Sequence, residues 1–170
     1  SSPSRGLGDV YKRQVENGKT FKENAKIKSV FAAKKSGLIC ISDDSGLEVD
    51  ALDKKPGIFS ARWAGKTKNF DIAIKKIFNL LNKIKKLNSK ARFICAISLA
   101  FPNGKSFEFQ GKVEGKISFP ARGKKGFGYD PIFIAKGKKI TFAQMNKKEK
   151  NLISHRFDAF KKIKKYFKFS

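Results

Sequence analysis

The stretch SDDSGLEVDAL, residues 42–52, places two adjacent carboxylates, Asp43 and Asp44, before a Ser-Gly pair and a half-apolar run. Carboxylates at a strand end beside a glycine turn suit Mg²⁺, because this hard cation takes oxygen ligands and often bridges substrate phosphates. One carboxylate could hold the ion or accept a proton from a bound water. Asp, Ser and Gly are also the commonest turn formers, so DDSG by itself favours an Asx-type turn that ends the strand.

A second segment, PARGKKGFGYDPIF at 120–133, places glycines at 123, 126 and 128 among basic and aromatic residues. Glycine lets the backbone approach a ligand closely, and an aromatic neighbour offers a stacking face for a base. The G-x-G-x-x-G dinucleotide spacing is absent. Alone, the pattern is as typical of a flexible surface hairpin as of a binding loop.

The segment KKEKNLISHRFDAF, residues 147–160, holds the only histidine, His155, followed by Arg156. On a helix Lys150 and Ser154 are four residues apart, so they can share one end of a groove with the His-Arg pair if the helix points into it. A lone histidine is more often structural than catalytic. Metal binding there is disfavoured, because no second His or Cys is nearby.

Two further segments each allow two interpretations. In GKTFKENAKIK at 18–28, Thr20 and Glu23 have the capping-box spacing of a helix start, and Lys28 points either at phosphates or into solvent. In PGIFSARWAGKT at 56–67, the forked donors of Arg62 could meet an anion. The alternative for this segment is a packed Trp63 with Arg62 in solvent.

Hydrophobic spacing predicts the elements that position these residues. A helix from Thr20 to about Lys35, stopped by Gly37, should lead into a short strand, LICIS, that presents DDSG at its carboxyl end. An amphipathic helix is predicted over 70–87, with an apolar stripe formed by Phe70, Ile74, Ile77, Phe78, Leu81 and Ile84. The remaining elements are a buried strand at 92–101 closed by the turn PNGK, alternating antiparallel strands over 105–119, a short strand PIFI at 131–134, and one final helix from Lys147. The pattern predicts a mixed α/β fold with a partly antiparallel sheet.

Size and composition favour one domain without repeats, since 170 residues with 40% hydrophobic content suffice for a single core. The two cysteines, Cys40 and Cys95, lie in apolar runs without a Cys-x-x-Cys pair, which indicates a reducing, intracellular setting and no structural zinc. No apolar run approaches the ~20 residues of a membrane span. We therefore expect a cytoplasmic protein without a membrane partner.

The formal charge of +25 favours non-specific attraction to nucleic acid. The basic residues are mostly lysines spread over almost every segment, which favours a solvated lysine-rich surface over a dedicated nucleic-acid face. The positive electrostatic field of these lysines would also attract a triphosphate substrate.

Residues 1–14, SSPSRGLGDVYKRQ, differ in composition from the rest of the chain: they hold two of the six arginines and one lysine. They show neither helical nor strand periodicity. We expect a foreign or misassembled leader here, and a single domain over 15–170.

The order of these motifs is more specific than any one of them. DDSGLEVDAL, then PGIFSARWAG, FPARGKKGFGYDPIF, and QMNKKEKN ending in SHR, resembles the inosine triphosphatase-like family of non-canonical purine nucleoside triphosphate pyrophosphatases, over residues 15–168. The resemblance implies a Mg²⁺-dependent hydrolase that converts inosine, deoxyinosine or xanthosine triphosphate to the monophosphate and pyrophosphate. It also implies a homodimeric α/β protein with an elongated sheet, flanking helices, and two lobes around a central cleft.

The resemblance also assigns roles to residues. It implies that Asp44 is the general base and a metal ligand, with Glu16 as a second metal ligand, whereas Asp43 orients Asp44 or caps the turn. The residues that it implies for substrate binding are Lys28, Ser45, Arg62, Phe127, Gly128, Tyr129, Asp130, Lys150, His155 and Arg156.

These roles agree with the chemistry. A tetra-anionic triphosphate needs a metal and several cations, which Lys28, Arg62, Lys150 and Arg156 would supply. A 6-oxo purine needs hydrogen-bond donors aimed at its oxygen, which His155, Arg156 and backbone amides near Phe127 could provide.

One feature departs from the family pattern: residues 1–14 contain no strand running into the Ser/Thr-Gly-Asn-x-x-Lys phosphate loop. The expected domain therefore lacks its first strand and that loop. Two other functions stay open. One is a basic nucleic-acid-binding module without catalysis, and the other is a related hydrolase acting on modified pyrimidine nucleotides.

Overall fold

The computed structural model describes residues 17–168, so Glu16 and the predicted leader lie outside the described residues. A five-stranded sheet forms the centre, in the order β2-β1-β3-β4-β5, and its four strand pairings are all antiparallel. The strands are β1 (Cys40–Val49), β2 (Lys55–Pro56), β3 (Lys90–Ala100), β4 (Ser106–Ile117) and β5 (Phe133–Ala135). The expected mixed α/β fold with an elongated sheet is confirmed.

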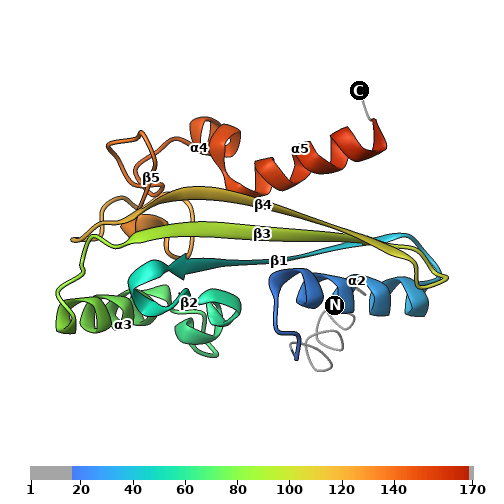
Figure 1. Cartoon of the computed structure of the whole chain (residues 1–170), viewed down its shortest axis with the longest axis horizontal. Coiled ribbons are helices and arrows are strands. Elements are labelled where there is room, and N and C mark those ends of the chain that lie inside the picture. Colours follow the sequence, from blue (N-terminus) through green and yellow to red (C-terminus); the bar gives the residue numbers. More distant parts are fainter. Residues whose placement is uncertain (1–16, 169–170) are drawn as a thin grey trace.

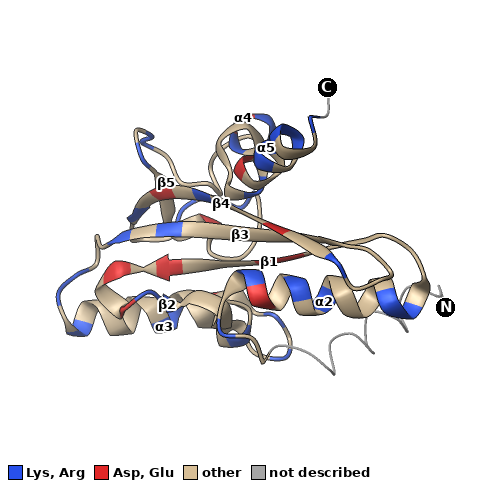
Figure 2. Cartoon of the chain, turned by 45° about the vertical axis from the view of Figure 1, so that its right-hand side comes forward, with Lys and Arg blue, Asp and Glu red and all other residues tan. Residues whose placement is uncertain are grey.

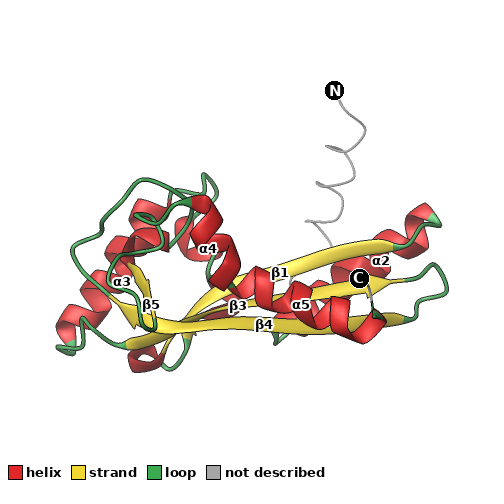
Figure 3. Cartoon of the chain, turned by 90° about the horizontal axis from the view of Figure 1, so that it is seen from above, coloured by secondary structure: helices red, strands yellow, loops and turns green. Residues whose placement is uncertain are grey.

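Two helices lie along opposite faces of the long strands, α2 (Phe21–Ser36) on one and α5 (His155–Phe167) on the other (Figure 1). The other two described helices, α3 (Phe70–Lys83) and α4 (Lys147–Ile153), gather with β5 at one end of the sheet, as the view from above shows (Figure 3). The sheet therefore carries one helix on each face over its long part and more helices at one end.

Local signals set the limits of α2 as predicted. The Thr20 hydroxyl accepts a hydrogen bond from the amide of Glu23 at 3.1 Å, and the Glu23 carboxylate accepts one from the Lys19 amide at 2.6 Å. The helix ends at Gly37, whose φ of 73° is the left-handed conformation that glycine adopts without strain.

The main core lies between α3 and the adjacent end of the sheet. Ile77 and Leu81 of α3 are fully buried there, together with Leu47 of β1 and Phe133 of β5. The amphipathic pattern over 70–87 is thus confirmed, but the helix ends at Lys83, so Ile84 lies beyond it and is exposed.

The prediction that DDSG ends a short strand is wrong. Asp43, Asp44 and Ser45 lie inside the ten-residue β1, and each pairs with a residue of β3. The ladder continues from Cys40 opposite Ala100 to Val49 opposite Ala91. Long-range pairing therefore overrides the turn preference of Asp, Ser and Gly.

The prediction of one final helix from Lys147 is also wrong, because Ser154 separates α4 from α5. Its extended backbone, with φ −71° and ψ 158°, stops α4, and its hydroxyl caps α5 by accepting a hydrogen bond from the Phe157 amide at 3.2 Å. His155 and Arg156 consequently occupy the first turn of α5 rather than the middle of a longer helix.

Basic residues are distributed over helices, strands and loops instead of gathering in one stripe (Figure 2). This distribution agrees with the predicted lysine-rich surface. Within residues 17–168, no helix is long and apolar enough to cross a membrane.

Candidate functional site

The two adjacent carboxylates of β1 face opposite sides of the sheet. Asp43 Oδ2 lies 2.7 Å from Arg156 Nη1 of α5, whereas Asp44 Oδ1 lies 3.9 Å from Lys28 Nζ of α2. Successive side chains of a strand alternate between its faces, and α2 and α5 cover different faces (Figure 1). Asp43 thus does not orient Asp44 or cap a turn, and its carboxylate fixes an arginine instead.

Lys28 also contacts the backbone of β1, since its ammonium donates to the Asp43 carbonyl oxygen at 2.5 Å. Along the edge of β1 that faces away from β3, the only described partner strand is β2, and it pairs with β1 at Glu48 and Val49 alone. Lys28 therefore does not simply extend into solvent, because its ammonium lies at the edge of β1 beside Asp44, and its contact with phosphates stays a prediction.

Ser45 lies on the same face as Asp43 and donates a long hydrogen bond of 3.5 Å to Asp43 Oδ2. Directly opposite on β3 is Cys95, which is fully buried. Burial raises the pKa of the Cys95 thiol, so this cysteine stays protonated near neutral pH. It behaves as a core residue, as predicted.

The glycine loop is organised around Asp130, which is only 3% exposed. Its Oδ2 accepts from Lys150 Nζ at 2.5 Å and from the Phe127 amide at 3.0 Å. Burial raises the pKa of Asp130, while Lys150 and the Phe127 amide oppose that rise. Lys150 therefore ties the loop to α4 as well as adding positive charge.

The two aromatic residues of the loop have different environments. The Phe127 side chain is 69% exposed, and Lys150 Nζ lies 4.9 Å from the ring centre. Tyr129 is 3% exposed, packs edge-to-face on Phe70, and donates its hydroxyl to the Ser60 carbonyl oxygen at 2.6 Å. Gly128 between them has a φ of 65°. Phe127 is thus the ring of this loop that can stack on a base.

His155 is 8% exposed and stacks on Phe93 of β3, with ring centres 5.0 Å apart. Burial lowers its pKa to about 4, and the charges of Arg156 and Lys150 act in the same direction. The imidazole is therefore neutral at pH 7. Its Nδ1 is buried and has no hydrogen-bond partner within the part of the chain that the structure describes.

Arg62 begins a short 3₁₀ turn, Arg62–Ala64, and is exposed to solvent. Its guanidinium lies 4.7 Å from the centre of the Phe59 ring, while Trp63 packs against the main core. This arrangement matches the second sequence interpretation, a packed Trp63 with Arg62 in solvent, and the binding of an anion by Arg62 stays a prediction.

One residue at the junction of these segments, Ser60, lies within the PGIFSARWAG motif but was given no role from the sequence. It is 4% exposed and lies two residues before Arg62. Its hydroxyl accepts from the Leu47 amide at 2.8 Å, and its carbonyl accepts from Tyr129. The motif does not contain Leu47 or Tyr129, so only the fold reveals these contacts.

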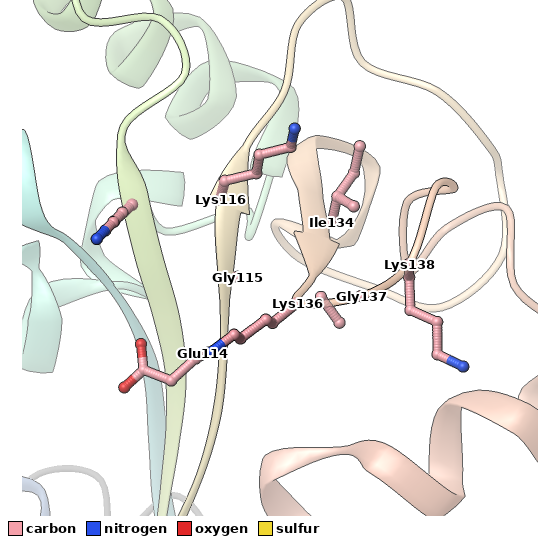
Figure 4. Close-up of a pocket in the computed structure, with 9 residues that line it drawn as sticks. Glu114, Gly115, Lys116, Ile134, Lys136, Gly137 and Lys138 are labelled. Carbon is pink, nitrogen blue, oxygen red and sulfur yellow. The ribbon is translucent and has the colours of Figure 1, made fainter.

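A cavity of about 500 Å³ lies elsewhere, between the ends of β4 and β5 (Figure 4). Its lining includes Lys116, Ile134 and Lys138, and none of the predicted site residues belongs to it. The candidate site is consequently not this cavity but the part of β1 that Lys28 and Arg156 contact from either face.

The oxygen donors of this region fit a magnesium site in which the protein supplies only one or two ligands. Residues 17–168 contain no cluster of three or more His, Cys, Asp or Glu side chains that could enclose a metal. Asp44 offers a partly buried carboxylate, with 19% of its side chain exposed. Mg²⁺ commonly takes one or two protein carboxylates and completes its shell with water and substrate phosphates, which Asp44 satisfies.

The chain resembles known proteins in both sequence and fold. Residues 4–166 match the sequence model of a protein family described as the Ham1 family. It is 47% identical over 150 residues to the dITP/XTP pyrophosphatase of Zymomonas mobilis, covering 88% of this chain and 72% of that protein. With the dITP/XTP pyrophosphatase of Bacillus subtilis, it shares 46% identity over 150 residues, 88% of this chain and 76% of that protein.

Solved structures give the same result. The Ham1 protein of Staphylococcus aureus superposes with a TM-score of 0.84 and 37% identity, covering 99% of this chain and 95% of that one. A HAM1 protein from Coxiella burnetii gives a TM-score of 0.84 at 35% identity, covering 100% and 96%. From its sequence match and its fold, this chain belongs to the Ham1 family.

Proposed function

We propose that this chain hydrolyses the non-canonical purine nucleotides dITP, XTP and ITP to the monophosphate and pyrophosphate. The observation that carries the proposal is the placement of Asp44 beside the Lys28 ammonium, 3.9 Å apart, on a strand that Arg156 contacts from the other face. A carboxylate among cations can activate water next to a polyphosphate. The names of the two curated relatives support the same substrates.

In this mechanism Asp44 is the general base that takes a proton from the attacking water. Lys28, Arg62 and Arg156 bind the triphosphate and neutralise charge as the bond to the leaving pyrophosphate breaks. Lys28 is well suited to this role because its bond to the Asp43 carbonyl fixes the ammonium near Asp44. Ser45, next to Asp44 in β1, would contact the substrate with its hydroxyl.

Asp44 would also hold Mg²⁺, and Glu16 would be its second carboxylate. When bound, the ion would neutralise part of the charge of the phosphates and hold them in place. The partly exposed carboxylate of Asp44 is compatible with an ion that keeps some of its waters.

Base recognition falls to the glycine loop and the start of α5. The exposed Phe127 ring offers a stacking face, and its position is set by the Asp130–Lys150 ion pair through the Phe127 amide. His155 is neutral, so it presents one donor and one acceptor to a purine, which is the type of contact that distinguishes an oxo from an amino substituent. Homodimer formation and a cytoplasmic location stay predictions.

Pyrophosphate release tests the proposal directly. The purified chain is incubated with dITP, XTP, ITP, dGTP and ATP in the presence of Mg²⁺, and again after addition of EDTA. We expect release from the first three substrates, little from dGTP and ATP, and none with EDTA until Mg²⁺ is added in excess. The absence of release from dITP, XTP and ITP alike would refute the proposed function.

A further inference from the structure

The buried Ser60 connects three segments that each contribute to the candidate site. Its hydroxyl accepts from the Leu47 amide of β1 at 2.8 Å and donates to the Gly57 carbonyl oxygen at 2.6 Å. Its own carbonyl oxygen accepts from the hydroxyl of Tyr129 at 2.6 Å. One residue therefore joins the strand of Asp44, the turn before Arg62 and the glycine loop.

The strand is built to accept this contact. Gly46, which lies between Ser45 and Leu47, has no side chain where the 57–60 segment approaches. A Cβ atom at Gly46 would lie 2.5 Å from the Gly57 oxygen and 2.6 Å from the Ser60 hydroxyl, far inside normal contact distances. The segment can therefore lie directly against β1, one residue away from Ser45.

The contact with Tyr129 is buried at both ends. Ser60 is 4% and Tyr129 3% exposed, and the tyrosine ring packs against Phe70 with ring centres 5.3 Å apart. A buried hydrogen bond costs free energy when one partner is removed, because the remaining group loses its only compensation for desolvation. The glycine loop is thus held against the 57–60 segment rather than merely lying beside it.

From these contacts we propose that Ser60 is a positioning residue, which holds the base-recognition loop and the Arg62 turn in one fixed arrangement relative to Asp44. The inference rests on the proposed function. Neither Ser60 nor the Tyr129 hydroxyl touches the substrate in this assignment. They act by keeping Phe127, Arg62 and Asp44 at fixed positions relative to one another. A base that is bound correctly then places the phosphates correctly for hydrolysis.

Three single variants and the Ser60→Ala/Tyr129→Phe double variant test the proposal. Ser60→Ala removes the hydroxyl that binds Leu47 and Gly57, while Tyr129→Phe removes the bond to Ser60 and keeps the ring on Phe70. Ser98→Ala is the matched control: Ser98 is also fully buried and hydrogen-bonded, but its partners are Ser29 and Glu108, which have no assigned role in the site. Pyrophosphate release is measured for dITP and dGTP, and thermal unfolding for all proteins.

The decisive quantity is the ratio of kcat/KM for dITP to kcat/KM for dGTP, because a reduced folded fraction cancels in this ratio. We expect Ser60→Ala and Tyr129→Phe to lower kcat for dITP roughly tenfold and the ratio at least roughly threefold. The double variant should be little worse than either single variant, since both act through the same chain of bonds. Ser98→Ala should lower the melting temperature and leave the ratio unchanged.

The proposal is overturned if the ratio for Ser60→Ala and for Tyr129→Phe stays at the wild-type value, or if Ser98→Ala lowers it equally. Should Ser60→Ala fail to fold, Tyr129→Phe decides alone, because it removes one hydroxyl and keeps the packing. The outcome is distinct from failure of the proposed function, in which the unmodified chain itself releases no pyrophosphate.

Discussion

Asp43 and Asp44 are adjacent in the sequence but belong to opposite faces of the sheet. Asp43 forms an ion pair with Arg156 at 2.7 Å, and Asp44 lies near Lys28 at 3.9 Å. The strand geometry therefore gives two identical side chains different environments and different roles. Lys28 and Arg156 nevertheless meet at Asp43, since one binds its carbonyl oxygen and the other its carboxylate.

Asp44→Asn tests the general base. Removing the carboxylate while keeping its size should lower kcat at least about 100-fold, because general base catalysis typically contributes a factor of that order or more. The melting temperature should change little, since the amide still fits the site. Steady-state pyrophosphate release from dITP gives the rate, and a variant that retained more than a third of kcat would exclude Asp44 as the base.

Asp43→Asn should have a different effect. The pair with Arg156 is about two-fifths exposed on both sides, and exposed pairs are worth up to about 1 kcal/mol. We expect KM for dITP to rise by up to roughly fivefold, which is that free energy expressed as an affinity ratio, with kcat nearly unchanged. A loss of kcat as large as that of Asp44→Asn would show that the two carboxylates act together.

Gly126→Ala tests the packing of the glycine loop. Gly126 has a φ of 71°, and a Cβ atom there would lie against the Asp130 carboxylate, well inside normal contact distance. The control is Gly137→Ala, where φ is 80° but no atom lies within 4 Å of the added Cβ. Both substitutions carry the backbone cost of about 1 kcal/mol, and Gly126→Ala should cost about 1 to 2 kcal/mol more, because the Asp130–Lys150 pair has to shift.

Urea unfolding of both variants gives this difference directly. Gly126→Ala should also weaken the preference for dITP over dGTP, because the Phe127 amide is bound to the same carboxylate oxygen. Equal destabilisation by the two substitutions would mean that the Asp130 carboxylate moves away from the added methyl group without a loss of stability.

The buried His155 predicts a dependence of stability on pH. Its pKa is about 4 in the folded chain and near 6.5 when unfolded, so between these values the unfolded state holds more protons. Lowering the pH through this window therefore favours unfolding, and the stability present above pH 6.5 is lost as the pH falls toward 4.

The free energy of unfolding should fall by about 2 kcal/mol more in the unmodified chain than in His155→Gln when the pH is lowered from 7 to 5. The raised pKa of Asp130 acts in both proteins and cancels in this comparison. Identical pH dependence of the two proteins in urea unfolding would show that His155 titrates normally.

The sequence by itself determined the features that depend on neighbours along the chain. Thr20, Glu23 and Gly37 delimit α2 because their hydrogen bonds and backbone angles involve residues within a few positions. The apolar spacing of α3 predicts its buried face for the same reason, since a helix presents every third or fourth residue to one side. The order of the motifs further indicated the family.

Only the tertiary structure decided the features that depend on distant partners. DDSG is a strand and not a turn because ten residues of β3 pair with β1, and no local pattern contains that partner. The same holds for the opposite faces of Asp43 and Asp44. Their roles are set by α2 and α5, which lie on either side of the sheet.

The contacts of single side chains in the site were equally beyond the sequence. Tyr129 points inward and Phe127 outward, although both lie in one glycine loop, because Ser60 and Phe70 supply partners for the tyrosine alone. Ser60 lies in a quoted motif, but the motif does not show what its side chain contacts. Its importance comes from bonds to residues 13 and 69 positions away, which only folding brings together.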